Sequence, residues 1–533
     1  MYSARLFSSL LGAALLAPFA QALTQNGPGP LDNAAVLPAG TLRFRIAPRW
    51  TAADRRFGSP IDGGSTTQDF AAFLSADSLG VREVPSLGTF EQRIRAVSVA
   101  PDFRLSLGTT RIRAQSRSTS VPINIEYGLG LRFALSVSVP IVRSVINLVA
   151  NGNANDSTAN AGISPRVYNE AEASRLATLA SQFSSALSQL RSRYPSCFSA
   201  TPGAGCSAIA QLDTTARSYA VLVAATYGAV ALVPVAGSAA HDAVLARLIS
   251  LNDQFRAALG LAPSINPIGI RPLGALPIAD ADLQRLVTDT TFGIQADSLV
   301  PVERTSIGDV EVGLTFRIVD RWNSLVGPKI RASATALYRA GTGRPGRPSV
   351  LLDAATGDGQ ADVEGRFALD ARVTRRVVAS VAARYTVQMA DELDMRLPVA
   401  EVRLLPVSQR AQVTRDLGDQ IGVDGRASYF INGYLAGVAA YGFARRGSDI
   451  YTPTISSSGA SAFTSPTHSM QNLGIGLSYS TLDAVSRGRA RVPLEVAWLH
   501  RQTFAGSGGA PRTFSDAVEL RFYAGGSRRR AAR

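Results

Sequence analysis

The chain has 533 residues, of which 46% are hydrophobic and 18% are charged, and its formal net charge is +14. This length allows two or three soluble domains, or one large barrel with insertions. Arginine carries the basic balance, because Lys329 is the only lysine. A basic chain can indicate a nucleic-acid partner, but the arginines are spread along the sequence and the one block, Arg528–Arg530 with Arg533, ends the chain. The sequence therefore predicts no nucleic-acid partner.

The first residues have the pattern of a secretory signal peptide. Arg5 provides the positive charge of the n-region, and Leu6–Phe19 form the apolar h-region. Ala20-Gln21-Ala22 has the small residues that a cleavage site requires. We expect residues 1–22 to be removed and the mature chain to begin near Leu23. The chain is therefore predicted to be exported.

A segment rich in Pro, Gly and Asn, residues 23–40, is interpreted as a linker to the first strand, Thr41–Trp50. In that strand Arg43, Arg45 and Arg49 alternate with apolar side chains. Successive side chains of a strand point to opposite faces, so the arginines share one face. Several arginines on one face are costly in a dry core, but a water-filled lumen accepts them.

The clearest pattern lies between Val121 and Ile141. Every odd position outside a Gly-Leu-Gly link is apolar or aromatic, and the even positions include Asn124, Glu126 and Arg132. This period of two predicts a β-hairpin with one apolar and one polar face. A soluble sandwich would show the same period, so repetition, strand length and export must decide between sandwich and membrane barrel.

The alternation returns at Ile307 and continues to the end of the chain. The predicted segments are approximately 307–318, 329–340, 362–373, 377–388, 420–431, 434–445, 471–480, 492–501 and 513–524. Most are long enough for a tilted strand to cross a bilayer, which takes about 9–11 residues, whereas soluble strands usually have about 5–6. Short connections alternate with long ones, as in barrels with periplasmic turns and outer loops.

The predicted fold class is all-β: a transmembrane antiparallel up-and-down β-barrel with an inserted α-helical subdomain. Thirteen segments can be counted, and bacterial single-chain barrels have an even number of strands. The region Gln92–Gln115 fits two strands, or a short helix and one strand. Two strands there would give about 14 strands in all, and 12 is the alternative.

Residues 151–306 interrupt the strands with a helical pattern. Apolar residues recur three and four apart in Asn169–Arg193 and in His241–Leu259, which indicates amphipathic helices. Ile209–Val233 is predicted as a further helix and Asp280–Thr288 as a weaker one. The apolar run Tyr219–Ala236 has a length at the limit for a membrane helix, but its amphipathic neighbours favour a buried helix of a small helical domain.

The two cysteines of the chain, Cys197 and Cys206, flank a Pro-Gly turn between two predicted helices. In an exported chain such a pair predicts a disulfide. The spacing and the compartment both argue against a zinc or redox pair, so no metal and no cofactor are predicted.

Charged residues of both signs occupy the polar face of nearly every predicted strand, and we interpret them as candidate lumen-lining residues. They form either a polar permeation path with some anion bias or a web of salt bridges that fills the barrel, and the two roles are compatible. These residues are Arg43, Arg45, Arg132, Asp309, Glu311, Arg317, Asp362, Glu364, Arg366, Asp370, Arg372, Arg384, Glu495, Glu519 and Arg521.

Catalytic and calcium-binding patterns are weak. A barrel hydrolase needs a nucleophile beside a histidine, but His468 and Ser469 are adjacent on a strand and therefore point to opposite faces. No Gly-x-Ser-x-Gly motif is present. Residues 353–364 have the length of a calcium loop, but Ala355 and Gly357 stand at ligand positions and Asp358 stands where the turn glycine belongs. The sequence predicts that the protein is not an enzyme.

The phrases Glu126-Tyr-Gly-Leu-Gly-Leu-Arg-Phe with Ser138-Val-Pro, and Gly308-Asp-Val-Glu-Val-Gly-Leu, resemble strand–turn phrases of outer-membrane transporters for hydrophobic compounds. These are the long-chain fatty-acid transporters and related aromatic-hydrocarbon transporters. The resemblance implies a barrel of 14 strands with an N-terminal plug. This chain departs from that pattern, because a long helical insertion interrupts its barrel and only a short segment precedes strand one. No substrate-site residue is carried over.

The sequence thus predicts an outer-membrane channel or uptake protein for small solutes, with hydrophobic compounds as candidates. The alternative is a barrel anchor that displays the helical domain for surface binding, and an outer-membrane hydrolase is a distant third. The expected partners are outer-membrane lipid, a small-molecule solute and the barrel-assembly machinery of a diderm bacterium. The predicted division is residues 1–22 signal peptide, 23–40 linker, 41–150 first part of the barrel, 151–306 helical insertion, 307–525 second part of the barrel and 526–533 basic tail.

Overall fold

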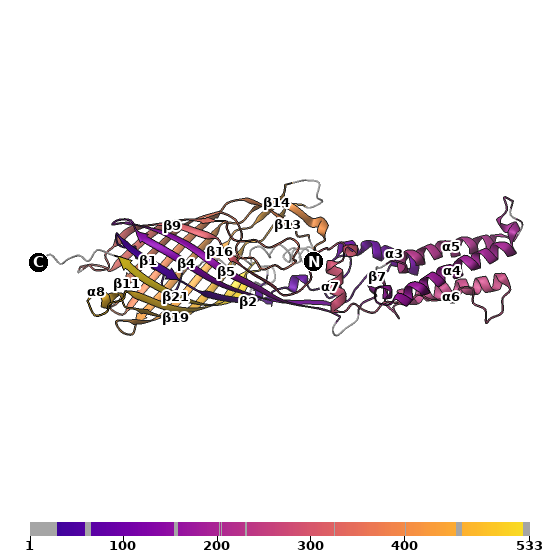
Figure 1. Cartoon of the computed structure of the whole chain (residues 1–533), viewed down its shortest axis with the longest axis horizontal. Coiled ribbons are helices and arrows are strands. Elements are labelled where there is room, and N and C mark those ends of the chain that lie inside the picture. Colours follow the sequence, from indigo (N-terminus) through magenta and orange to yellow (C-terminus); the bar gives the residue numbers. More distant parts are fainter. Residues whose placement is uncertain are drawn as a thin grey trace.

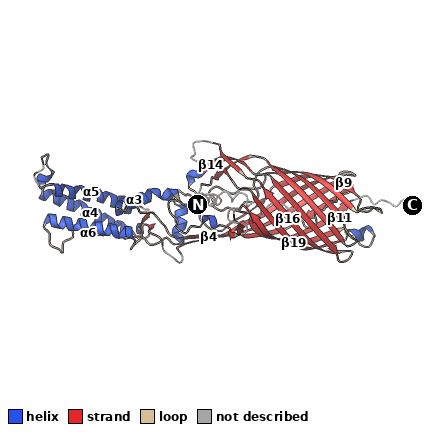
Figure 2. Cartoon of the chain, turned by 180° about the vertical axis from the view of Figure 1, so that it is seen from behind, coloured by secondary structure: helices blue, strands red, loops and turns tan. Residues whose placement is uncertain are grey.

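The protein is elongated, with a β-barrel at one end and a helical rod at the other (Figure 1), as a computed structural model shows. The structure describes residues 29–58, 66–153, 158–201, 203, 205–229, 232–324, 326–399, 401–454 and 461–525. The predicted signal peptide, the first part of the predicted linker and the basic tail lie outside the described residues. Figure 2 shows the same division, with strands in the barrel and most helices in the rod.

Over the described residues, twelve antiparallel strands close the barrel. Two of them are interrupted: β1 (Thr41–Ile46) continues in β2 (Arg49–Phe57), and β8 (Val302–Ile307) continues in β9 (Val310–Asp320). The others are β4 (Thr110–Gly128), β5 (Phe133–Gly152), β10 (Ile330–Ala340), β11 (Asp362–Arg372), β12 (Val377–Gln388), β15 (Gln420–Phe430), β16 (Leu435–Arg446), β19 (His468–Ser480), β20 (Leu494–Ser507) and β21 (Pro511–Gly525). The barrel closes where β1 pairs with both β21 and β4.

The expected 14 strands are wrong, and the alternative of 12 is confirmed. The difference lies in Gln92–Gln115, which holds the larger part of helix α3 (Gly88–Ser98) and the beginning of β4. Phe90, Ile94 and Val97 lie on one buried side of α3, three and four residues apart. The alternation that begins at Thr110 then runs without a break into the Val121 hairpin, so two expected strands are one long strand.

The outer surface of the barrel is apolar and its interior is polar. Phe367 on β11 is 44% exposed, whereas its neighbours Glu364 and Asp370 on the inward face are buried. Outward aromatic side chains also occur toward the strand ends, among them Trp50, Tyr127, Tyr385, Tyr479, Trp498 and Phe522. An apolar outside around a polar lumen is what a barrel in a membrane requires.

Replacing Phe367 by Arg should destabilise the barrel by roughly 2–4 kcal/mol, because it places a charge at the middle of an outward-facing strand surface. Urea unfolding in lipid vesicles, followed by tryptophan fluorescence, measures the change. The matched control is Ala368→Ser, the next residue, which lines the lumen and should unfold nearly as the wild type does. Equal stability of Phe367→Arg and wild type would show that this face does not lie in lipid.

Connections at the two ends of the barrel differ in size. At one end, the turn end, lie the β4–β5, β11–β12 and β15–β16 turns, together with the β19–β20 connection that carries α8 (Leu482–Ser486). At the other end, the loop end, lie β3 (Thr67–Asp69), a small sheet of β13 (Asp391–Arg396), β14 (Arg410–Asp416), β17 (Ile450–Pro453) and β18 (Phe463–Thr464), and the helical insertion.

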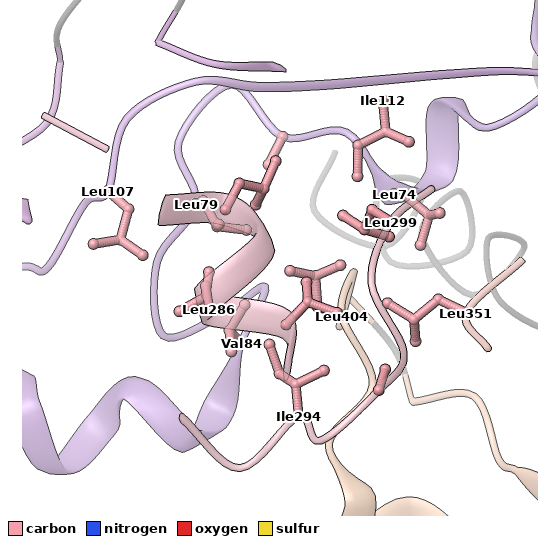
Figure 3. Close-up of a cluster of buried hydrophobic side chains, with 14 of the residues drawn as sticks. Leu74, Leu79, Val84, Leu107, Ile112, Leu286, Ile294, Leu299, Leu351 and Leu404 are labelled. Carbon is pink, nitrogen blue, oxygen red and sulfur yellow. The ribbon is translucent and has the colours of Figure 1, made fainter. Parts of the chain in front are cut away.

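A separate hydrophobic core (Figure 3) is built at the loop end, where α7 (Asp280–Thr288) lies between the barrel and the rod (Figure 1). Segments far apart in the sequence meet there: Leu79, Val84 and Leu107 precede and follow α3, and Leu286 lies on α7. Leu351 and Leu404 join the same cluster from the loops after β10 and β13. We call this cluster the cap, because loops from several strands pack together in it.

The rod consists of α4 (Glu170–Arg193), α5 (Ser207–Tyr227) and α6 (Ala239–Leu259), with α3 packed against α5 and α6 and a two-stranded sheet of β6 (Ala161–Ile163) and β7 (Leu232–Pro234) at its base. Its core joins the buried faces of these helices, including Phe183, Tyr219, Leu248 and Phe255. None of the helices in the described part of the chain combines the length and the apolar character of a membrane span.

Cys197 and Cys206 form the predicted disulfide between α4 and α5. Their Cα atoms lie 5.0 Å apart, and the sequence separation is 9. A closed loop of this length should stabilise the rod by about 2–3 kcal/mol on the chain-entropy model.

The double variant Cys197→Ser and Cys206→Ser should lower the free energy of unfolding of the rod by about 2–3 kcal/mol and leave the barrel unchanged. Loss of helical circular dichroism on heating reports the rod, and the heat-dependent gel shift of the folded barrel reports the strands. A fall in barrel stability of the same size would contradict two independently stable parts.

Candidate functional site in the barrel lumen

Residues 29–38, which fall in the predicted linker, lie inside the barrel, and we call them the lumen segment. The backbone N–H of Leu31 donates to Glu519 Oε2 at 3.0 Å, and that of Ala34 donates to Asp370 Oδ2 at 3.0 Å. Arg426 Nη1 donates to the carbonyl oxygen of Pro30 at 2.5 Å. Strands β11, β15 and β21 therefore hold this short stretch of irregular backbone by side-chain hydrogen bonds.

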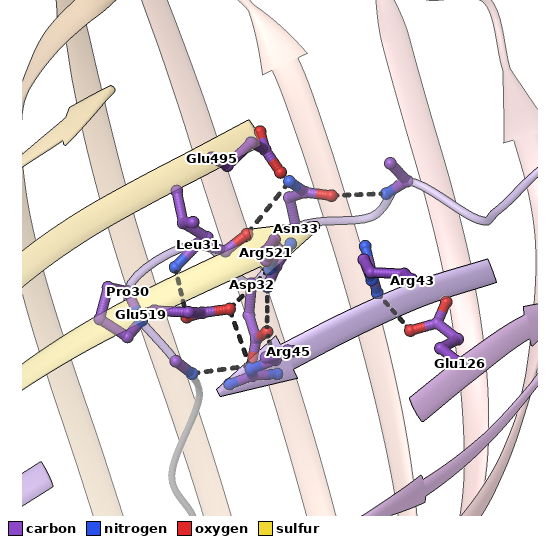
Figure 4. Close-up of polar contacts among 12 residues, drawn as sticks. Pro30, Leu31, Asp32, Asn33, Arg43, Arg45, Glu126, Glu495, Glu519 and Arg521 are labelled. Atoms are coloured by element: carbon purple, nitrogen blue, oxygen red, sulfur yellow. Dashed lines mark hydrogen bonds and ion pairs between the residues drawn. The ribbon is translucent and has the colours of Figure 1, made fainter. Parts of the chain in front are cut away.

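Asp32 attaches the lumen segment to the barrel wall through ion pairs (Figure 4). Its carboxylate accepts from Arg45 and from Arg521, each at 2.8 Å. Glu519 joins the same two arginines, at 2.9 Å from Arg45 and 2.6 Å from Arg521. Burial by itself would raise the pKa of Asp32, but the two guanidinium groups hold the pKa well below its usual range. Asp32 is therefore ionised while the segment is in place.

Two glycines permit the close approach of the segment to the wall. A Cβ on Gly29 would lie 2.1 Å from Arg45 Nη2, and a Cβ on Gly128 would lie 2.0 Å from the carbonyl oxygen of Pro38. Gly128 ends β4 and accepts a backbone hydrogen bond from Gly40 at 2.9 Å. Only glycine fits where the segment leaves the lumen and turns into β1.

A second network surrounds Arg339 on β10, closer to the loop end. Its guanidinium contacts Glu311 at 2.9 Å, Asp362 at 2.9 Å and Glu364 at 3.4 Å, and all four side chains are buried. Strand register explains the contacts, because Arg339 lies opposite Glu311 on β9 and opposite Asp362 on β11. One arginine thus neutralises carboxylates from both neighbouring strands.

Most of the predicted lumen residues take part in these networks. Arg43 pairs with Glu126, Arg366 with Glu364, Asp370 with Arg331, and Tyr523 donates to Glu495. Arg384 lines the lumen without such a pair among the described residues. The predicted residues found in the lumen are Arg43, Arg45, Glu311, Asp362, Glu364, Arg366, Asp370, Arg384, Glu495, Glu519 and Arg521.

Four predicted residues lie toward the barrel ends. Arg132 and Arg372 are exposed at the turn end, where Arg372 lies over the ring of Trp322. Arg317 lies near the same turns and pairs with Asp320 at 3.8 Å. Asp309, where β8 passes into β9, accepts from the backbone N–H of Gly343 at 2.7 Å. Alternation places a side chain on a face, but it does not tell how far along the barrel that side chain lies.

Sequence reasoning missed several lumen residues. Asp32 lies before the first strand, so no alternation could identify it. Arg331 and Arg339 fall in a predicted strand, and the same inward alternation would have identified them. Asp424, Arg426 and Arg501 also line the lumen, and so does Arg49, which the alternation of the first strand had already placed on the same face as Arg43 and Arg45.

A cavity with an empty volume of about 1620 Å³, part of it open to solvent, lies beside the lumen segment. Arg43, Arg45, Arg49, Arg366, Arg384, Arg426 and Arg501 line it, against Asp32, Glu126, Glu311, Asp370 and Asp424. Arginines outnumber carboxylates on its surface. Structural salt bridges and open space therefore coexist in the lumen.

Ser469 and Asn472 have hydrogen-bond partners other than His468. Ser469 Oγ lies 2.9 Å from Ser507 Oγ, and Asn472 accepts from Thr503 at 2.6 Å. His468 is buried. These contacts give Ser469 no histidine partner of the kind that activates a nucleophile.

No family model and no curated protein matches this chain. Solved structures with a similar arrangement include an outer membrane channel from Pseudomonas putida F1, at 8% identity and a TM-score of 0.41, covering 94% of this chain and 100% of that chain. A FadL homologue of Pseudomonas aeruginosa is 8% identical at a TM-score of 0.28, covering 95% and 97%. The toluene transporter TodX of P. putida is 11% identical at a TM-score of 0.25, covering 94% and 98%.

Each of these likenesses has a TM-score below 0.5 and carries no argument about this chain. At such identities and scores they add nothing about the solute. Function is therefore inferred from the closed barrel itself, its apolar outside and its charged lumen.

Proposed function

We propose that the protein is an outer-membrane channel for small solutes whose lumen is closed by its own residues 29–38. The observation that carries the proposal is the cavity inside a closed barrel, occupied on one side by the lumen segment and lined by charged side chains. No enzymatic activity is proposed, because among the described residues Ser469 pairs with Ser507 and not with His468.

The apolar outer face supports placement in the outer membrane, with lipid around the barrel and assembly by the barrel-assembly machinery. Barrels of this kind have short turns in the periplasm and long loops outside. The turn end would then face the periplasm, and the cap and the rod would face outward. An export signal at residues 1–22 is part of the same proposal.

Opening requires the lumen segment to move, and its contacts are of a kind that can exchange. Asp32, Leu31 and Ala34 are held by ion pairs and hydrogen bonds. Val36 and Leu37 pack in a small cluster with Ala134 near the exit toward β1. Water and ions can replace the polar contacts, whereas the apolar contact would keep the segment tethered.

Replacing Asp32 by Asn should raise the open probability of the channel, because Arg45 and Arg521 lose the carboxylate that attaches the segment to the wall. Single-channel recording in planar bilayers measures the open probability, and about a tenfold rise corresponds to about 1.4 kcal/mol of lost attachment. Asp77→Asn is the matched control, because Asp77 is exposed and pairs with Arg111 away from the lumen. Identical traces for wild type, Asp32→Asn and Asp77→Asn would contradict gating by the segment.

A second candidate function, surface display, is favoured by the rod. The rod has its own hydrophobic core and extends away from the barrel (Figure 2). In this alternative the barrel is an anchor and the rod binds a partner outside the cell. Helices α4, α5 and α6 extend away from the barrel and do not enter its lumen (Figure 1).

Removal of residues 164–276 separates the two functions. The ends of that deletion lie together, because a Cβ on Gly162 would be 2.1 Å from the carbonyl oxygen of Leu276, so a short Gly-Ser link can join them. α7 remains, and of the buried residues of the cap only Leu232 and Ala240 are removed. If the protein is a channel, conductance should survive the deletion; loss of surface binding with an electrically silent barrel would favour the anchor instead.

A further inference from the structure

We propose that the cavity beside the lumen segment binds a small organic carboxylate, with Arg384 as the main contact and Arg49 and Arg501 beside it. This inference rests on the proposed channel and gives its solute a chemical class. It starts from the distribution of charge on the cavity wall, where arginines exceed carboxylates.

Arg384 has the free guanidinium that such a site needs. Among the described residues it makes no ion pair and no hydrogen bond, and it lines the cavity. Asp424 and Glu364 are the acidic side chains whose charges act on the guanidinium of Arg384. Asp424 already accepts from Arg501 at 2.9 Å, and Glu364 is engaged by Arg366 and Arg339. The guanidinium of Arg384 is therefore available to bind an anionic ligand.

Positive charge is concentrated around Arg384. The charge of Arg49 interacts with those of Arg501, Arg45 and Arg384, and with the opposite charge of Asp32. These side chains come from β2, β12, β20 and β1, so the closure of the barrel gathers them from distant parts of the sequence. Because Asp424 pairs with Arg501, the charge of Arg384 remains in excess, and an anion would neutralise it.

The wall below these arginines is built from small residues. Gly422 lies opposite Arg384 on β15, and a Cβ there would be 2.5 Å from Arg384 Nε. A Cβ on Gly442 would be 2.9 Å from Asp424 Oδ1 and 3.5 Å from Arg501 Nη1. Glycine at these positions lets the guanidinium groups lie against the wall. Space remains in front of them for a ligand.

The apolar residues of the cavity lining indicate what the uncharged part of the ligand is. Apolar side chains share the cavity with the arginines, namely Ala47, Pro122, Leu337, Ala368, Ala382 and Ala517. A guanidinium binds a carboxylate through two parallel hydrogen bonds, and the apolar residues accept a small hydrocarbon group. A carboxylate with a small aromatic or aliphatic body fits both features better than an inorganic anion.

Equilibrium dialysis of radiolabelled benzoate against the purified full-length protein in detergent tests the site without requiring an open channel. Wild type should bind benzoate, and benzyl alcohol, which has the same shape without the charge, should not displace it. Arg384→Gln should weaken binding by about tenfold or more, as expected for the loss of a hydrogen bond between charged groups. Arg384→Lys should restore part of the affinity because it restores the charge.

Arg132→Gln is the matched control, since Arg132 is exposed at the turn end and does not line the cavity. The heat-dependent gel shift establishes that each variant is folded. No binding by folded wild type, equal binding by Arg384→Gln and Arg132→Gln, or displacement by benzyl alcohol would each overturn the site. Ion conductance without benzoate binding would contradict the proposed carboxylate site and support the proposed channel. Benzoate binding without conductance would contradict the channel and support the site.

Discussion

The barrel depends on the neutralisation of two opposed arginines at its closing seam. The first and last barrel strands, β1 and β21, meet with Arg45 directly opposite Arg521. Like charges in directly opposed positions destabilise a strand pair. Glu519 from the wall and Asp32 from the lumen segment lie between them, and each carboxylate contacts both guanidinium groups. Closure of the barrel and the position of residues 29–38 are therefore parts of one electrostatic arrangement.

Other buried charges along the lumen are neutralised in the same way. Buried charges are stable only where they are paired and hydrogen-bonded, and Arg339 meets this requirement with Glu311, Asp362 and Glu364. The salt bridges of Arg339 fill the lumen beside β9, β10 and β11. On β15 and β16, Gly422 and Gly442 have no side chain that would crowd Arg384, Asp424 and Arg501. A filled lumen and an open cavity are consequently compatible in one barrel.

The cap and the rod follow a different physical principle. Each has a hydrophobic core of its own, as a water-soluble domain does. β4 and β5 are the longest strands of the barrel, with 19 and 20 residues, and they connect the barrel to the parts beyond it. Because the cap draws on loops from several strands, it ties the rod to the barrel as a whole and not to one hairpin.

The sequence by itself determined most of what depends on local period. Alternation every two residues identified the strands and their apolar and polar faces, spacing of three and four identified the rod helices, and the isolated cysteine pair identified the disulfide, now seen between Cys197 and Cys206. These features need only neighbours along the chain. The apolar outward position of Phe367 and the inward position of Glu364 follow from the same rule.

Only the tertiary structure decided the number of strands, the charge pairs and the place of the lumen segment. Helix α3 replaced an expected strand because Ile94 and Val97 share a buried helical face. Strand register places Arg339 opposite Glu311 and Asp362, which lie on the two strands that flank β10. Asp32 lies 489 residues from Arg521 in the sequence and has no periodic neighbours. Its partners exist only when the barrel closes, because the seam that joins the first strand to the last is what creates them.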